Sequence, residues 1–316
     1  MTEPAAAVLA LLRARQQARA EGDFATADAL RDEIRTAGWL IIDSPTGPSL
    51  HPAPAWPTYP GLAEVLAAAR ANHHRPAVGV VVDIIVDGWP ADITDCVTAL
   101  LAHAPADIRI HLLDLGDVDG AGAAAADCAA GHPDRVVVTH VATTLRQVGW
   151  SAAIMTMLTC DETPRHVLIE PSTILTGDAL TPLVDALDDP GVAAAGWRGV
   201  MVDRADNWRS VHEAPPGEVD ALLGYLLIVD RQAALTSPVH PAAQFYRNAD
   251  LEWSLALRAA GGRLIALGDA LPVRQGRHRG YHDTDPAYRD AQSRRTYDRL
   301  LRRFRGRDEI LVPRAG

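Results

Sequence analysis

The order of the expected elements places most of this chain in the α/β class. From residue 76 onward, short runs rich in Val, Ile and Leu alternate with segments whose apolar residues recur at helical spacing. Strands that alternate with helices along a chain build a sheet covered by helices. Hydrophobic residues make up 48% of the 316 residues, which excludes disorder, collagen and coiled coil as the main state.

Each element of this α/β domain can be placed on the sequence. Uninterrupted apolar runs predict buried strands, and the segments between them have the length and composition of helices. Strands are expected over residues 78–86, 108–113, 136–141 and 167–169, with helices over residues 93–103, 121–130 and 151–158.

A helical hairpin is expected before the sheet. Residues 5–37 carry apolar residues at helical spacing on both sides of a break at residues 21–24. Residues 39–50 predict a short strand and a turn. The Pro-rich stretch 51–60 predicts a semi-rigid linker, and a short helix over residues 62–71 follows it.

The last part of the chain is rich in arginine, with eleven Arg residues between positions 274 and 307. Residues 286–305 predict an amphipathic helix, whose apolar face should pack on the core. Its arginines could also meet anionic lipid, a polyprenyl-phosphate acceptor or nucleic acid. The i, i+3, i+4, i+7 apolar stripe consists of Tyr297, Leu300, Leu301 and Phe304.

These features divide the chain into four segments. The expected boundaries are residues 1–50 for the helical hairpin, 51–75 for the linker and short helix, 76–285 for the sheet domain, and 286–316 for the Arg-rich helix and tail.

The composition excludes several classes of function. The formal net charge of −10 excludes a uniformly cationic nucleic-acid binder. Every basic residue is Arg, so no Lys can form a Schiff base or serve as a Walker lysine. Cys96, Cys128 and Cys160 lack the spacing of a zinc site or a disulfide framework. Neither a signal peptide nor a membrane-spanning run is evident, so we expect a soluble, cytoplasmic protein.

Carboxylates follow two of the expected strands. Asp114 comes at the end of the second strand, and Glu170 comes directly after the fourth. Open α/β sheets bind ligands at the carboxyl ends of their strands, although Asp and Gly also simply end strands. A third carboxylate, Asp250, precedes a helical segment, where it could serve either as a helix N-cap or in catalysis.

Residues 22–39, with the sequence GDFATADALRDEIRTAGW, resemble the last segment of cysteinyl-tRNA synthetases, as do Arg13 and the run from Asp43 to Gly47. In that family the segment forms a C-terminal helical module near the anticodon stem of tRNA. Here the resemblance covers only about 45 residues, at the opposite end of the chain. The HIGH-type and KMSKS-type signatures are absent, so aminoacylation is not expected. The hairpin is expected to dock or dimerise, which leaves a homodimer open, and tRNA contact is the less favoured alternative.

Residues 77–285 resemble a family-2-type glycosyltransferase with the GT-A fold, a mixed sheet flanked by helices that binds nucleotide-diphospho-sugars. The stretch from Leu113 to Gly120 aligns with the family's strand-end DDGSxDGT sequence, although Leu115 replaces the second Asp. Residues 149–152 match the helix start before the metal-binding strand. The resemblance assigns nucleotide-sugar binding to Asp114, Asp119, Gly149, Ser151 and Glu170.

Glu170-Pro171-Ser172 takes the place of the DXD motif in this resemblance. A DXD motif holds Mn²⁺ or Mg²⁺ against the diphosphate, and such hard cations take oxygen ligands. Glu170 keeps the first acid, whereas Ser172 replaces the second. A late His completes the metal site in several members of the family, and His278 and His282 are the candidates here. Arg277 and Arg279 suit a diphosphate.

Asp250 aligns with the general base of the family, an Asp that takes the proton of the acceptor hydroxyl. Such direct displacement inverts the anomeric centre. Acceptor recognition is expected from the region around this Asp, because sugars stack on aromatic faces, with core packing of these rings as the alternative. The candidates are Trp197, Tyr225, Glu252 and Trp253, together with Trp208, Phe245 and Tyr246.

The sequence thus predicts a glycosyltransferase that moves a sugar from a UDP- or GDP-sugar to a hydroxyl acceptor. The alternative is a degenerate, non-catalytic domain that acts as an RNA- or protein-binding adaptor. That alternative is motivated by Leu115, Ser172 and Ala249, which stand where the family has acids.

Overall fold

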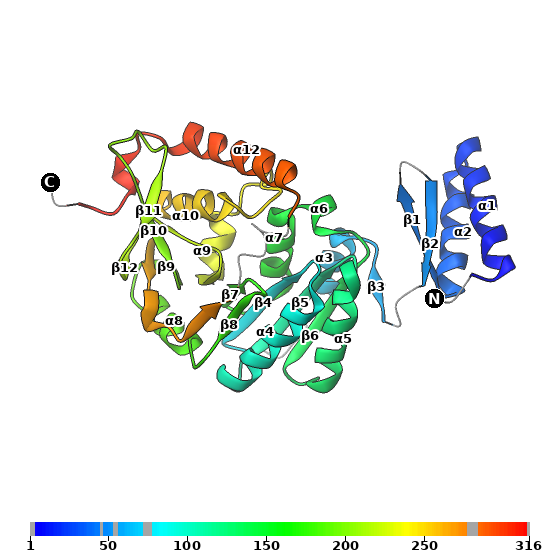
Figure 1. The fold of residues 1–316 in the computed structure, drawn as a ribbon, viewed down its shortest axis with the longest axis horizontal. Helices are drawn as coiled ribbons and strands as arrows, with labels where there is room; N and C mark the ends of the chain where they lie inside the picture. The colour runs from blue at the N-terminus through cyan, green and yellow to red at the C-terminus, as the bar shows by residue number, and fades with distance from the viewer. Residues whose placement is uncertain (1–3, 45–46, 53–55, 72–77, 277–283, 315–316) are drawn as a thin grey trace. The chain divides into compact units, whose positions relative to one another are not determined.

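The computed structural model describes residues 4–44, 47–52, 56–71, 78–276 and 284–314. The chain divides into two compact units, Met1–Pro57 and Thr58–Gly316 (Figure 1). None of the described helices combines the length and hydropathy needed to cross a membrane.

The first unit pairs two helices with a β-hairpin. Helices α1 (Ala6–Glu21) and α2 (Phe24–Thr36) precede strands β1 (Trp39–Ser44) and β2 (Gly47–Pro52), which pair antiparallel. The side chain of Asp23 caps α2 by accepting from the backbone N–H of Thr26 at 3.0 Å. The small core consists of Val8, Ile34 and Trp39. The structure has two strands where the sequence predicted one strand and a turn.

The second unit is built on a nine-stranded mixed sheet (Figure 1), with the order β12-β15-β9-β14-β7-β4-β5-β6-β3. Strands β4, β5, β6 and β7 run parallel to one another, and β14 runs antiparallel to β7 and β9. The strands are β3 (Thr58–Tyr59), β4 (Val80–Val86), β5 (Arg109–Leu115), β6 (Val136–Val141), β7 (Arg165–Ile169), β9 (Val192–Gly196), β12 (Gly217–Glu218), β14 (Leu226–Asp230) and β15 (Arg263–Ala266).

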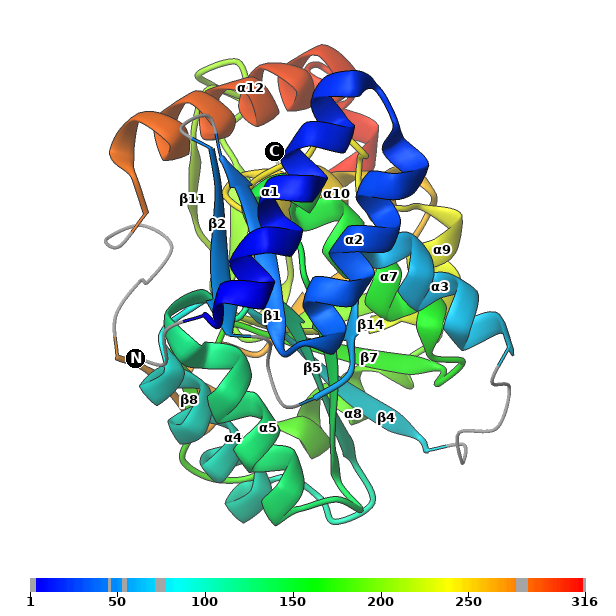
Figure 2. The ribbon, with the colours of Figure 1, turned by 90° about the vertical axis from the view of Figure 1, so that its right-hand side faces the viewer.

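Helices cover both faces of this sheet, and Figure 2 shows β4, β5 and β7 between the two layers. Helices α4 (Pro90–His103), α5 (Ala121–Gly131) and α8 (Leu180–Leu187) pack on one face. On the other face lie α3 (Leu62–Ala71), α7 (Trp150–Cys160), α9 (Arg231–Thr236) and α10 (Ala249–Ala259). Every residue of β5 is buried, as expected for a parallel strand covered on both faces.

The predicted helix over residues 93–103 begins three residues earlier, at Pro90. The fixed φ of proline suits the first position of a helix, where the backbone N–H that proline lacks would have no partner within the helix. The predicted helix over residues 62–71 and the strand over residues 136–141 are confirmed at these bounds.

The C-terminal segment covers α10 and a small sheet, which has the order β11-β10-β13. These strands are β10 (Gly199–Val202), β11 (Val211–Glu213) and β13 (Ala221–Leu222). Helix α12 (Pro286–Phe304) buries Leu300 and Phe304 in the apolar cluster that it forms with α10 and this small sheet, which confirms the predicted amphipathic helix. The buried carboxylate of Asp220 accepts from the N–H groups of Val202 and Val312, which ties the chain end to the sheet.

A buried polar network crosses the middle of the large sheet. Asp83 on β4 lies between His111 of β5 and His166 of β7, whose Nδ1 atoms lie 3.1 and 2.6 Å from its carboxylate oxygens. Burial would raise the pKa of Asp83, but the interaction with His166 and the hydrogen bonds from both histidines lower it to about 2. His111 continues the network to Thr139 of β6, 3.0 Å away. The network centred on the Asp83 carboxylate therefore connects four adjacent strands, β7, β4, β5 and β6.

We predict that Asp83→Ala lowers the free energy of unfolding by about 3–5 kcal/mol, because it leaves two histidines buried without their partner. Urea denaturation at pH 7 measures the difference from the wild type. The exposed Asp127→Ala is the control and should change stability by less than about 0.5 kcal/mol. Because the pKa of Asp83 is lowered, its contribution is complete above its ordinary value of 3.8 and is lost as the pH falls toward 2. Equal stability of Asp83→Ala and wild type at pH 7 would contradict this role.

Candidate active site

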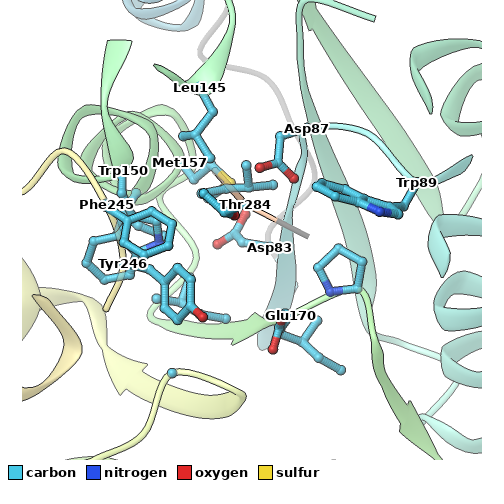
Figure 3. A pocket seen from close by; sticks show the side chains of 16 residues that line it. Asp83, Asp87, Trp89, Leu145, Trp150, Met157, Glu170, Phe245, Tyr246 and Thr284 are labelled. Carbon is cyan, nitrogen blue, oxygen red and sulfur yellow. The ribbon is translucent and has the colours of Figure 1, made fainter. Parts of the chain in front are cut away.

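A cleft opens at the carboxyl ends of β4 and β7, where the N-terminus of α7 approaches the sheet (Figure 3). Its empty volume, with the open mouth included, is about 790 Å³. The lining residues are Asp83, Ile85, Asp87, Trp89, Leu145, Trp150, Ile154, Met157, Leu168, Ile169, Glu170, Pro171, Gly224, Phe245, Tyr246 and Thr284.

Aromatic rings form two walls of this cleft. Figure 3 shows Trp89 on one side and Trp150, Phe245 and Tyr246 on the other, with the carboxylates of Asp87 and Glu170 between them. The rings of Phe245 and Tyr246 lie 4.7 Å apart at a tilt of 55°. The site therefore offers aromatic faces and carboxylate oxygens to one ligand.

Glu170 follows the last residue of β7 and is held from two sides. Its N–H donates to the carbonyl of Tyr225 at 3.0 Å, which links it to the loop before β14. Its Oε2 accepts from the side-chain amide of Gln275 at 2.9 Å. Gln275 lies on β16 (Val273–Gln275), which pairs with β8 (Thr173–Leu175) beside the cleft. Sequence analysis had not identified Gln275, because only this pairing brings it to Glu170.

Ser172 lies two residues beyond Glu170, and its Oγ is buried without a hydrogen-bond partner among the described residues. The described part of the chain holds no group of three His, Cys, Asp or Glu side chains able to bind a metal ion. His278 and His282, together with Arg277 and Arg279, lie outside the described residues. One carboxylate and one unpaired hydroxyl fit a cation that takes its other ligands from substrate phosphates and water.

Asp250 lies in the first turn of α10, behind Gly224 in the cleft wall. Its Oδ2 accepts from the N–H of Gly224 at 3.0 Å, and its Oδ1 accepts from the N–H of Leu251 at 2.9 Å. Burial raises the pKa of Asp250 to about 6, although these N–H groups act in the opposite direction. The helix begins at Ala249 with Asn248 as N-cap, so the interpretation of Asp250 as an N-cap is wrong.

Two phenols, those of Tyr225 and Tyr246, are influenced by the carboxylates of both Glu170 and Asp250. Burial and both carboxylates raise the pKa of Tyr225 to about 12. The same causes raise the pKa of Tyr246 well above the ordinary range. Both phenols therefore stay protonated at neutral pH and can donate hydrogen bonds.

Asp87 and Trp89 were missed by sequence analysis, although both line the cleft. They follow β4 in the order Asp-Gly-Trp-Pro, just before the helix start at Pro90. Trp89 has a φ of 55°, a left-handed conformation that is unfavourable for a bulky residue. Such local strain often occurs at functional sites. The signal in the sequence was an acidic residue directly after a strand that is apolar apart from Asp83.

Asp114 and Asp119 do not line the cleft. Asp114 is buried and accepts from the N–H of Asp117 at 3.1 Å, while its other oxygen lies 2.8 Å from Nδ1 of His140. The carboxylate of Asp119 lies beside Gly88, since a Cβ built on that glycine would be 3.7 Å from its Oδ2. The structure thus places Asp119 next to the loop that carries Asp87 and Trp89.

Gly149 and Ser151 position the start of α7 and leave Trp150 in the cleft wall. Gly149 has a φ of 87°, and a Cβ there would lie 2.7 Å from Oε1 of Gln244, so no larger residue fits without a shift. Ser151 is buried and donates through its hydroxyl to the carbonyl of Val239 at 3.3 Å.

Trp197, Tyr225, Glu252 and Trp253 are not among the residues that line the cleft, whereas Phe245 and Tyr246 are. Trp197 is buried in the core and meets Tyr225 edge-on, with ring centroids 6.3 Å apart. Trp253 is buried and donates its indole N–H to the carbonyl of Ser237 at 2.8 Å. Glu252 is 2% exposed and pairs with Arg299 and Arg303 of α12. These contacts give Trp253 and Glu252 structural roles, whereas Tyr225 lies beside the cleft.

Comparison with known proteins separates the two units. Residues 2–47 match a family model described as the cysteinyl-tRNA ligase anticodon binding domain. A cysteine–tRNA ligase of Opitutus terrae is 53% identical over 51 residues, which is 16% of this chain and 11% of that protein. The chain thus spans about a tenth of the length of this relative. The predicted resemblance of the N-terminal segment is confirmed.

The second unit has the fold of GT-A glycosyltransferases, as predicted. The mannosyltransferase PcManGT of Pyrobaculum calidifontis, solved with GDP-Man and Mn²⁺, superposes with a TM-score of 0.54 and 18% identity, covering 77% of this chain and 72% of that chain. GalNAc-T7, solved with UDP, GalNAc and Mn²⁺, superposes with a TM-score of 0.57 and 13% identity, covering 72% of this chain and 48% of that chain.

We predict opposite effects on stability for two acids of α10. Glu252→Gln should lower the free energy of unfolding at pH 7.5 by about 3 kcal/mol, because it breaks a buried ion pair. Asp250→Asn should leave stability unchanged or raise it. The pKa of Asp250 is raised in the folded state, so its favourable contribution is present below pH 3.8 and is lost as the pH rises through about 6. Urea denaturation of both variants measures this contrast, and a loss of stability in Asp250→Asn equal to that in Glu252→Gln would contradict it.

Proposed function

We propose that this protein is a glycosyltransferase that moves a sugar from a nucleotide-diphosphate sugar to a hydroxyl acceptor. The observation that supports this most directly is the placement of Asp250. Its buried carboxylate, with a pKa of about 6, accepts from the N–H of Gly224, a residue that lines the aromatic cleft at the carboxyl edge of the sheet. A general base works best when its pKa is near the working pH.

Asp250 would take the proton from the acceptor hydroxyl as its oxygen attacks the anomeric carbon of the donor sugar. The bond from that carbon to the diphosphate breaks, and the nucleoside diphosphate leaves. Attack from the face opposite the leaving group inverts the anomeric centre. The N–H groups of Gly224 and Leu251 hold the carboxylate in place for this step.

The charge of the cleft supports a role for a divalent cation. The described residues that line it include the acids Asp83, Asp87 and Glu170 but no Arg or His. A diphosphate would be repelled by such a lining unless a cation came with it. Glu170 would hold Mn²⁺ or Mg²⁺, with the hydroxyl of Ser172 nearby. The bound cation would neutralise the diphosphate charge as the leaving group departs.

The aromatic walls suit sugar and base rings. Trp89, Phe245 and Tyr246 present faces to the cleft, and the protonated phenols of Tyr225 and Tyr246 can donate to sugar hydroxyls. We therefore assign ligand contacts to the rings that line the cleft, in place of Trp197, Glu252 and Trp253, whose side chains make other contacts.

The first unit is the basis of the alternative function, an RNA- or protein-binding adaptor. Its match to an anticodon-binding domain favours RNA. Its charge does not, since residues 1–57 contain five Arg against seven Asp and Glu, a net charge of −2. Nucleic-acid affinity depends on cationic side chains that neutralise phosphates. We therefore propose that this unit docks on a protein or on a second copy of the chain.

We predict that the wild type binds UDP or GDP with an affinity at least about tenfold higher in the presence of Mn²⁺, because Glu170 would hold a cation whose charge offsets that of the diphosphate. EDTA should remove this gain. Glu170→Gln should abolish the dependence on Mn²⁺, whereas the exposed Glu162→Gln should keep it. Isothermal titration calorimetry measures all four cases. Failure of every nucleoside diphosphate to bind would favour the adaptor function.

We predict that Asp250→Asn lowers kcat by about 10²–10⁴-fold, because the amide cannot accept the proton of the acceptor. Nucleotide affinity should remain, since Asn keeps the size of the side chain and Glu170, not Asp250, would hold the cation. The wild-type rate should fall as the pH drops below about 6, where Asp250 becomes protonated. Turnover of UDP- and GDP-sugars with a panel of hydroxyl acceptors provides the measurement. Unchanged turnover of Asp250→Asn would exclude Asp250 as the base.

A further inference from the structure

The turn that leads into α10 lies between the cleft and the C-terminal helix. Tyr246 lines the cleft at the start of this turn, and Asp250 contacts the cleft wall at its end. The carbonyl of Tyr246 accepts from the N–H of Ala249 at 2.8 Å, which closes the turn. Between them, Asn248 has a φ of 65°, in the left-handed region.

The side chain of Asn248 points to α12 and is held there. Its amide donates to the hydroxyl of Ser293 at 2.8 Å and to the carbonyl of the same residue at 3.1 Å. Ser293 is buried on the inner face of α12, and Asn248 is half-buried. A single side chain therefore joins the turn before Asp250 to a helix 45 residues further along the chain.

A second connection lies one helical turn further on. Glu252 accepts from Arg299 through both of its carboxylate oxygens, at 2.9 and 2.6 Å, and from Arg303 at 2.7 Å. This buried ion pair fixes the first turn of α10 on α12, and the Asn248 contact fixes the turn before it. Asp250 lies between these two points of attachment.

We propose that Asn248 is a positioning residue, which sets the place of the Asp250 carboxylate by attaching its turn to Ser293 of α12. The inference rests on the proposed function of Asp250 as general base. Small errors in the placement of a base are costly, because a displacement of about 1 Å can reduce a rate by about 10²-fold. The charged and titratable groups that act on Asp250 and its surroundings are Arg247, Tyr225, Tyr246 and Glu170.

Asn248→Gly separates the hydrogen bonds from the backbone conformation. Glycine adopts a positive φ without strain, so this variant loses only the side-chain contact with Ser293. Ser293→Ala removes the hydroxyl on α12 that accepts from the side-chain amide of Asn248. Asp308→Ala is the control, because it breaks the 3.0 Å bond from the indole N–H of Trp208 at another attachment of the C-terminal segment.

The expected result is a kcat about 10- to 100-fold lower in Asn248→Gly and Ser293→Ala, with the KM for the donor within about twofold of the wild type. A ¹³C-carboxyl NMR titration, assigned with Asp250→Asn, should show the pKa of Asp250 lowered from its raised value. The reason is that a loosened turn lets water reach the carboxylate. Asp308→Ala should keep the wild-type kcat and the wild-type titration.

A wild-type kcat and titration in Asn248→Gly would overturn the inference, as would equal effects in Asp308→Ala. The titration needs no substrate. If the wild type transfers no sugar, the proposed function fails. The titration of Asp250 in Asn248→Gly then still tests whether Asn248 positions this carboxylate. Circular dichroism confirms that each variant is folded.

Discussion

The parallel register of β4, β5 and β7 is the constraint on which the site depends. Val86 of β4 lies opposite Asp114 of β5, and Asp83 of β4 lies opposite Leu168 of β7. Parallel strands end at the same edge of the sheet, so the residues after them meet there. Asp87 follows β4 and Glu170 follows β7, and both line one cleft. The buried bonds of Asp83 with His111 and His166 hold this register across three strands.

The C-terminal helix α12 contributes to the site by holding α10 in place. Helix α10 carries Asp250 to the sheet edge from a distant part of the sequence, and α12 fixes the start of α10 through Ser293, Arg299 and Arg303. The arginines of this helix that the structure describes are therefore divided by role. Arg299 and Arg303 pair with Glu252 and Arg289 pairs with Asp290, while the exposed Arg294, Arg295 and Arg302 have no such role in the described part of the fold.

The two units differ in how much of their function the fold supports. The second unit combines a GT-A fold with carboxylates and aromatic rings around one cleft, and the proposed sugar transfer rests on this combination. The first unit matches a domain found in cysteine–tRNA ligases but carries a net negative charge and only a small core. Two modules with separate chemistry thus occur in one chain.

Local pattern in the sequence was sufficient to predict β4, β7 and α7 and to place Glu170 at the end of a buried strand, whereas Asp250 was singled out by the family resemblance. Apolar runs identify buried strands, and an acid at the end of such a run lies at the sheet edge whatever the rest of the chain does. The roles of Asp114 and Glu252 were not decided locally. In the sequence, both acids lie in segments expected near the ligand-binding edge of the sheet. In the structure, the carboxylate of Asp114 contacts His140 and that of Glu252 accepts from Arg299.

The sequence by itself determined the α/β class, the resemblance of both units, and the acids at the ends of β7 and near the start of α10. Only the tertiary structure decided which side chains share the cleft. Trp89 acquires its place from a left-handed backbone, Gln275 from strand pairing, and Asn248 from a helix 45 residues away. Each of these positions depends on contacts between segments that are distant in the sequence. The spacing of residues along the chain therefore could not predict them.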